Sequence, residues 1–99
     1  MNVFGRIDEV YMEISFPNRV MPKVTAIGTI SFQALVDGDY LWCEISWEAL
    51  RDHFGAVSMD GNDLLYSFHQ NRAEIEQATI DYLRMNVGHP VLLMTVHFE

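Results

Sequence analysis

The chain has 99 residues, of which 49% are apolar and 20% are charged, and its formal net charge at pH 7 is −8. This composition is typical of one globular domain spanning residues 1–99 and excludes a disordered or collagen-like chain. An acidic chain whose basic residues form no stripe repels phosphate backbones and anionic lipids, so we expect neither nucleic acid nor a membrane as a partner.

The first predicted element is a strand over residues 10–16. Every second residue of this stretch is apolar, as in a half-buried strand: Val10, Met12, Ile14 and Phe16. Residues 1–9 precede this pattern, and we interpret them as an N-terminal extension or a lid. Residues 17–28 contain two prolines and are predicted to form a loop.

A β-hairpin is the clearest local signal, with strands over residues 29–36 and 39–45 around the turn Asp37-Gly38. A two-residue loop places Phe32 opposite Cys43, so that apolar residues share one face. A three-residue loop would instead place Phe32 opposite Glu44 and carry a carboxylate into the core. We therefore predict the first register.

Two helices are predicted after the hairpin. Ser46 is a suitable N-cap for a short helix over residues 47–54, and Gly55 supplies a left-handed stop. A long helix is expected to begin at Asp60 or Asn62 and to run to about residue 86. Its apolar stripe consists of Leu64, Leu65, Phe68, Ile75, Thr79, Tyr82 and Leu83.

The last predicted element is a strand over residues 91–98. We assign its inner face to Leu92, Met94, Val96 and Phe98, and its outer face to Val91, Leu93, Thr95 and His97. The order of elements predicts an α+β fold. We expect a two-layer sandwich, in which an antiparallel or mixed four-stranded sheet carries one short and one long helix on one face.

Several stretches of the chain are distinctive in combination: residues 32–38, 43–56 and 91–93, with Phe68, Arg72 and Ile75 in the long helix. With these stretches the chain resembles, over residues 30–98, a small bacterial family called domain of unknown function 1488. The resemblance implies a compact two-layer α+β domain. It implies no reaction and therefore identifies no catalytic residue.

The spacing of the chemically reactive residues predicts no cofactor and no metal site. No two of the four histidines lie three or four positions apart on a helix, as zinc motifs require. The single cysteine, Cys43, faces inward in the predicted register, where a thiol behaves as a small hydrophobe. A lone cysteine also excludes an internal disulfide and fits a cytoplasmic protein. No catalytic motif is present, which favours a protein that is not an enzyme.

Arg72 lies within the apolar stripe of the long helix, where a guanidinium must be paired or must reach water. Glu76, one turn further on, could accept its hydrogen bond, and so could Glu48 or Asp52 on the short helix. We predict that Arg72 is mostly buried in an ion pair that locks the two helices. An anion-binding site is the alternative.

The outer face of the hairpin carries Leu35, Tyr40 and Trp42, and we expect Leu93 to join them. Soluble monomers rarely expose such a patch, which residues 1–9, a second copy or a partner protein could cover. We favour a non-enzymatic interaction or structural module that forms a homodimer. The alternatives are a regulator that binds a basic protein through its acidic surface and, less favoured, an enzyme using Arg72 and a nearby histidine.

Overall fold

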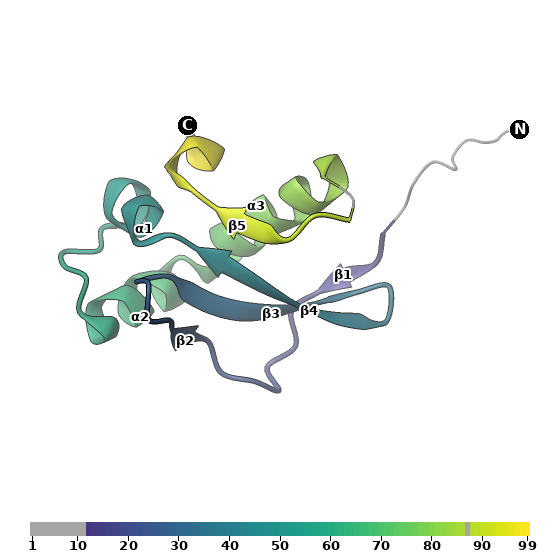
Figure 1. Cartoon of the computed structure of the whole chain (residues 1–99), viewed down its shortest axis with the longest axis horizontal. Helices are drawn as coiled ribbons and strands as arrows, with labels where there is room; N and C mark the ends of the chain where they lie inside the picture. Colours follow the sequence, from purple (N-terminus) through teal and green to yellow (C-terminus); the bar gives the residue numbers. More distant parts are fainter. Residues whose placement is uncertain (1–11, 87) are drawn as a thin grey trace, which may run out of the picture.

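The structure is a computed structural model and describes residues 12–86 and 88–99. It confirms the predicted α+β class, with a mixed sheet as one layer and the helices packed against it as the other (Figure 1). Within the described residues no helix is long and apolar enough to cross a membrane. The expectation for residues 1–9 lies outside the described residues.

The sheet has four positions across its width, in the order β1-β3-β4-β5, and a fifth strand, β2, shares the β1 side. β1 (Ile14–Ser15) and β2 (Lys23–Val24) pair antiparallel with opposite ends of β3 (Ile30–Val36). β4 (Asp39–Ile45) is antiparallel to β3, and β5 (Val91–Leu93) is parallel to β4. The sheet is therefore mixed.

Of the strand predicted over residues 10–16, residues 10–11 lie outside the described residues, and among residues 12–16 only Ile14–Ser15 pair with β3. The predicted alternation is present, since Met12 is buried and Glu13 and Ser15 are exposed. The predicted loop over residues 17–28 contains β2, which the sequence analysis missed. A strand of two residues is too short to produce a periodic pattern.

The register of the β3–β4 hairpin is confirmed, with Phe32 opposite Cys43 and Val36 opposite Asp39. The turn residues Asp37 and Gly38 both have positive φ, at 50° and 90°. A two-residue turn of this kind matches the twist of the two strands it joins. The inner faces of both strands are consequently apolar and lie against the helices.

The short helix is confirmed as α1 (Trp47–Phe54), and its caps are those predicted. The Ser46 hydroxyl accepts a hydrogen bond from the Ala49 backbone N–H at 3.1 Å, and Gly55 has a φ of 78°. The second helix, α2 (Gly61–Gln70), begins after Asp60, whose side chain accepts from the Asn62 N–H.

The prediction of one long helix to residue 86 is wrong, because the helix breaks at Asn71. α2 ends there and α3 (Arg72–Met85) begins, with the backbone of Asn71 at a φ of −121°. The Asn71 side-chain amide donates to the carbonyls of Ser67 at 2.9 Å and Phe54 at 3.3 Å. Such side-chain bonds compete with helix continuation, and here they also connect α2 to the end of α1.

The faces predicted for the last strand are also wrong. Val91 and Leu93 are 3% and 0% exposed, whereas Leu92 and Met94 are 40% and 48% exposed. Val91 lies beside Cys43 and Leu93 beside Ile45 in the parallel register, so the inward residues of both strands coincide. The strand ends at Leu93, and a 3₁₀ helix, η2 (Thr95–Phe98), follows it.

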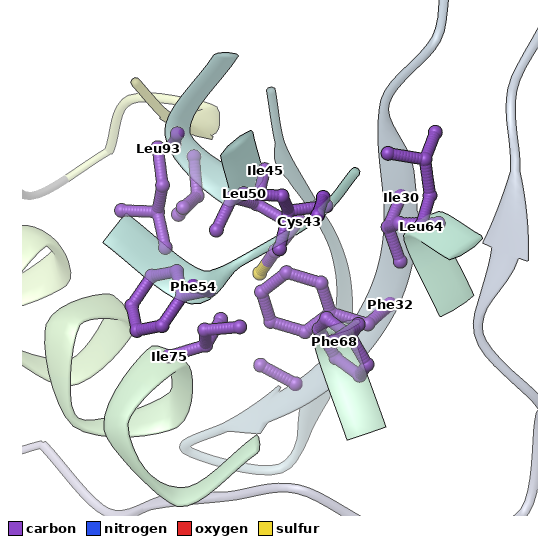
Figure 2. Close-up of a cluster of buried hydrophobic side chains, with 14 of the residues drawn as sticks. Ile30, Phe32, Cys43, Ile45, Leu50, Phe54, Leu64, Phe68, Ile75 and Leu93 are labelled. Carbon is purple, nitrogen blue, oxygen red and sulfur yellow. The ribbon is translucent and has the colours of Figure 1, made fainter. Parts of the chain in front are cut away.

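The core lies between the inner face of the sheet and the helices. Figure 2 shows side chains from the two layers pointing toward one another, among them Phe32 and Cys43 from the strands and Phe68 and Ile75 from the helices. The Phe32 and Phe68 ring centroids are 5.2 Å apart. This packing covers one face of the sheet. A functional surface on the sheet would therefore lie on the opposite face.

Candidate functional site

The outer face of the sheet carries three large exposed side chains, which we call the aromatic face: Tyr40, Trp42 and Leu92. Their exposed fractions are 49%, 43% and 40%. Tyr40 and Trp42 project outward because their neighbours in β4 face the core. Leu92 lies beside Glu44 on the adjacent strand and therefore projects to the same side.

Two cationic side chains lie on the aromatic rings. Arg19 belongs to the segment that leads into β2, and Lys23 is the first residue of β2. The Arg19 guanidinium is 4.0 Å from the centroid of the Tyr40 ring, and the Lys23 ammonium is 5.2 Å from that of Trp42. Cation–π contacts of this kind hold the segment against the sheet. They leave both aromatic side chains more than two-fifths exposed.

The β3 side of the outer face is covered, in contrast to the aromatic face. Ser31 and Gln33 are 7% and 6% exposed. Because β1 and β2 pair with opposite ends of β3, residues 16–22 join them alongside this part of the sheet. The buried Gln33 Oε1 has no hydrogen-bond partner within the described residues, an arrangement that costs stability.

The structure brings together only part of the predicted interface. Tyr40 and Trp42 lie side by side on the outer face as expected, and Leu35, which is half-buried, lies directly opposite Tyr40 on β3. Leu93 is fully buried in the core and does not lie on this face. Leu92 takes its place, and only the parallel pairing of β5 with β4 could have identified it.

Arg72 forms a local ion pair on α3. Its Nε donates to Glu76 Oε2 at 2.7 Å, and the two side chains are 23% and 25% exposed. The guanidinium also lies 5.5 Å from the centroid of the Phe68 ring. The Arg72 side chain is therefore mostly buried and hydrogen-bonded to an acidic side chain, as predicted.

The short helix does not supply the partner of Arg72. Glu48 is exposed on α1. Asp52 accepts hydrogen bonds from Arg51 at 2.6 Å and from the Thr95 hydroxyl at 3.2 Å. The bond from Arg51 holds the pKa of the Asp52 carboxyl below its usual value. The prediction that an Arg72 pair locks the two helices is wrong, because both partners lie on α3.

Replacing Arg72 with alanine is expected to lower the free energy of unfolding by about 1 kcal/mol, as for a partly exposed i,i+4 pair with one ring contact. Urea denaturation measures this change. Glu76→Ala is the matched control, because it removes the same pair and leaves the ring contact in place. A loss of about 3 kcal/mol in both variants would contradict the local pair and indicate a buried one.

Among the described residues, the geometry supports neither a metal site nor a reactive thiol. Within residues 12–86 and 88–99, no three His, Cys, Asp or Glu side chains are grouped so as to hold a metal ion. Cys43 is fully buried, and this burial raises the pKa of its thiol to about 12. A thiol with such a pKa is protonated at neutral pH and is a poor nucleophile.

A comparison with protein-family models matches residues 14–89 to the family described as "Protein of unknown function (DUF1488)". A search of the curated proteins and a search of the solved structures each found no match. The matched residues include β1 to α3, and hence Tyr40 and Trp42 of the aromatic face.

Proposed function

Because the chain belongs to DUF1488, a family of unknown function, we propose a function from its geometry: it is a non-enzymatic interaction module that self-associates through the aromatic face. The observation that carries this proposal is the exposure of Tyr40, Trp42 and Leu92 on the side of the sheet opposite the helices. Aromatic residues with polar neighbours are enriched in protein interfaces.

The energetics are compatible with a dimer of moderate affinity. Burying one large apolar side chain contributes roughly 1.5–3 kcal/mol, and a twofold-symmetric contact uses each residue of the patch twice. This gain must exceed the entropic cost of association. Two chains of net charge −8 repel each other, so added salt should strengthen the dimer by screening this repulsion.

Sedimentation of the wild type at micromolar concentrations is expected to give a dimer, and Trp42→Glu is expected to give a monomer, because a carboxylate on the aromatic face would be desolvated in the interface. Tyr66→Glu is the matched control. It places the same charge at an exposed aromatic position on α2 and should leave the dimer intact. A monomeric wild type would contradict self-association, and a dimeric Trp42→Glu variant would place the interface elsewhere.

A further inference from the structure

The two cationic side chains on the aromatic face have no acidic partner among the described residues. Arg19 and Lys23 are both exposed, and each lies on a ring, 4.0 Å from the centroid of Tyr40 and 5.2 Å from that of Trp42. Within residues 12–86 and 88–99, both ion pairs lie on helices and neither involves these two cations. A chain of net charge −8 therefore carries unneutralised positive charge on the aromatic face.

The three carboxylates of the β3–β4 hairpin leave this positive charge available. Glu44 projects to the same side as Trp42, but its carboxylate accepts a hydrogen bond from the Thr29 hydroxyl at 2.7 Å. Asp37 accepts from a backbone N–H at 2.9 Å. Asp39 precedes Tyr40 on the strand, so the alternation of side chains directs it to the opposite side of the sheet. An incoming anionic group would meet the cations first.

The spacing of the two cations matches an extended chain. Tyr40 and Trp42 are two positions apart on β4, so their rings are about 7 Å apart along the strand. Side chains at alternate positions of any extended segment project to one side at the same spacing. The contact with a ring leaves N–H donors of both Arg19 and Lys23 for a carboxylate. Two carboxylates at alternate positions could therefore meet both cations together.

The next position along the aromatic face favours an apolar side chain. Beyond Trp42, the next residue of β4 that projects outward is Glu44, and Leu92 of β5 lies beside it. Leu92 is 40% exposed. A third carboxylate would be repelled by Glu44, whereas an apolar side chain would cover Leu92 and remove apolar surface from water. The face thus fits two acidic residues and one apolar residue at alternate positions.

We propose that the aromatic face binds an extended acidic segment of a partner protein. Two carboxylates at alternate positions of the segment bind Arg19 and Lys23, and an apolar side chain at the next alternate position packs on Leu92. This goes beyond self-association. A second copy would bring the same cations against themselves, whereas an acidic segment neutralises them, so the two occupants compete for one face.

The observations favour a protein segment over a single-stranded nucleic acid. Nucleic acid bound to such a face would stack its bases on the aromatic rings. The rings of Tyr40 and Trp42 already carry cations. The net charge of −8 also repels a longer polyanion more strongly than a short segment with two carboxylates.

An NMR titration tests the proposal, with the indole N–H of Trp42 as the reporter. The peptide Glu-Thr-Glu-Thr-Leu, blocked at both ends, should shift this signal to saturation, with an affinity that falls as salt is raised. Trp47, on α1, is the internal control because its ring also carries a cation, at 4.8 Å. Its indole signal should not shift. Absence of a saturable shift at Trp42 would overturn the proposal.

Three matched ligands test the chemistry of the occupant. The peptide Glu-Glu-Thr-Thr-Leu has the same composition, but adjacent side chains of an extended chain project to opposite sides, so it should bind several-fold more weakly. The peptide Lys-Thr-Lys-Thr-Leu should not bind. A thymidine trinucleotide carries the same charge as the acidic peptides and should bind more weakly than the first. Equal affinities of the two acidic peptides, or a trinucleotide that binds as tightly, would overturn the proposal.

A charge reversal locates the contact. Lys23→Glu should weaken binding of the first peptide about fivefold, as when a repulsion replaces an exposed ion pair, and Lys23→Arg should retain binding. Arg84→Glu is the matched control, because it makes the same change of charge at an exposed position of α3. It should change the affinity less. Equal losses in Lys23→Glu and Arg84→Glu would mean that only net charge matters and would overturn the proposal.

Sedimentation with and without the peptide separates this inference from self-association. At saturating peptide, a wild-type dimer should become a monomer. A monomeric wild type whose Trp42 signal shifts with the peptide would contradict only self-association. A dimeric wild type whose Trp42 signal does not shift would contradict only the acidic segment. A dimer that persists while the peptide saturates Trp42 would place self-association elsewhere and support the acidic segment.

Discussion

Replacing Phe32 with alanine is expected to lower the free energy of unfolding by about 4 kcal/mol, because it removes a large side chain and leaves a cavity. Phe32 is 1% exposed in β3, the first strand of the hairpin. Its ring lies 5.2 Å from that of Phe68 on α2 and 6.4 Å from that of Phe16 after β1. One side chain therefore connects the sheet, a helix and the segment after β1; its contact with Phe68 is seen in Figure 2. Urea denaturation followed by far-UV circular dichroism measures the change.

Phe32→Leu is the control for this experiment. It retains most of the apolar volume and should cost about 1.5 kcal/mol. Comparable small losses for both variants would mean that Phe32 is not at the centre of the core, and would contradict the register that places it opposite Cys43.

Raising the pH from 9 to 12 is expected to destabilise the wild type more than Cys43→Ala. Burial raises the pKa of the Cys43 thiol from its ordinary value of 9.0 to about 12. In this window the unfolded chain loses the thiol proton while the folded chain keeps it. The stabilising contribution is therefore fully present below pH 9 and decreases as the pH rises toward 12. For one proton, the free energy of unfolding changes by at most about 1.4 kcal/mol per pH unit.

The difference between the two unfolding curves isolates this effect, because the tyrosines and lysine that also titrate at high pH are common to both proteins. Urea denaturation at a series of pH values gives that difference. A difference that stays constant from pH 7 to pH 12 would contradict a buried thiol. As a second readout, iodoacetamide should modify Cys43 in urea far faster than in the folded protein.

The features predicted correctly from the sequence depend on neighbours close along the chain. The Asp37-Gly38 turn needs two residues that tolerate positive φ, and the hairpin register follows from which residue that turn places opposite Phe32. Ser46 and Gly55 cap α1 through contacts within a few residues. Such signals are visible in the sequence because their energetics are local.

The break at Asn71, and the choice of Glu76 among the possible partners of Arg72, depended on the tertiary structure. Asn71 leaves the helix because its amide also reaches the Phe54 carbonyl, which is 17 positions away. Neither glycine nor proline marks that position, and the apolar stripe continues through it. For Arg72 the sequence offered Glu76 on its own helix and Glu48 or Asp52 on the short helix as partners, and the structure selects Glu76 at 2.7 Å.

The sequence by itself determined the fold class, the hairpin and which residues of β4 face outward, because strict alternation around a two-residue turn allows only one apolar face. Only the tertiary structure decided which residues of β5 face inward. Both Val91 and Leu92 are apolar, so periodicity could not choose between them, and the parallel pairing of Val91 with Cys43 did. The tertiary structure also decided that β5 begins at the pairing of Val91 with Cys43 and ends at that of Leu93 with Ile45.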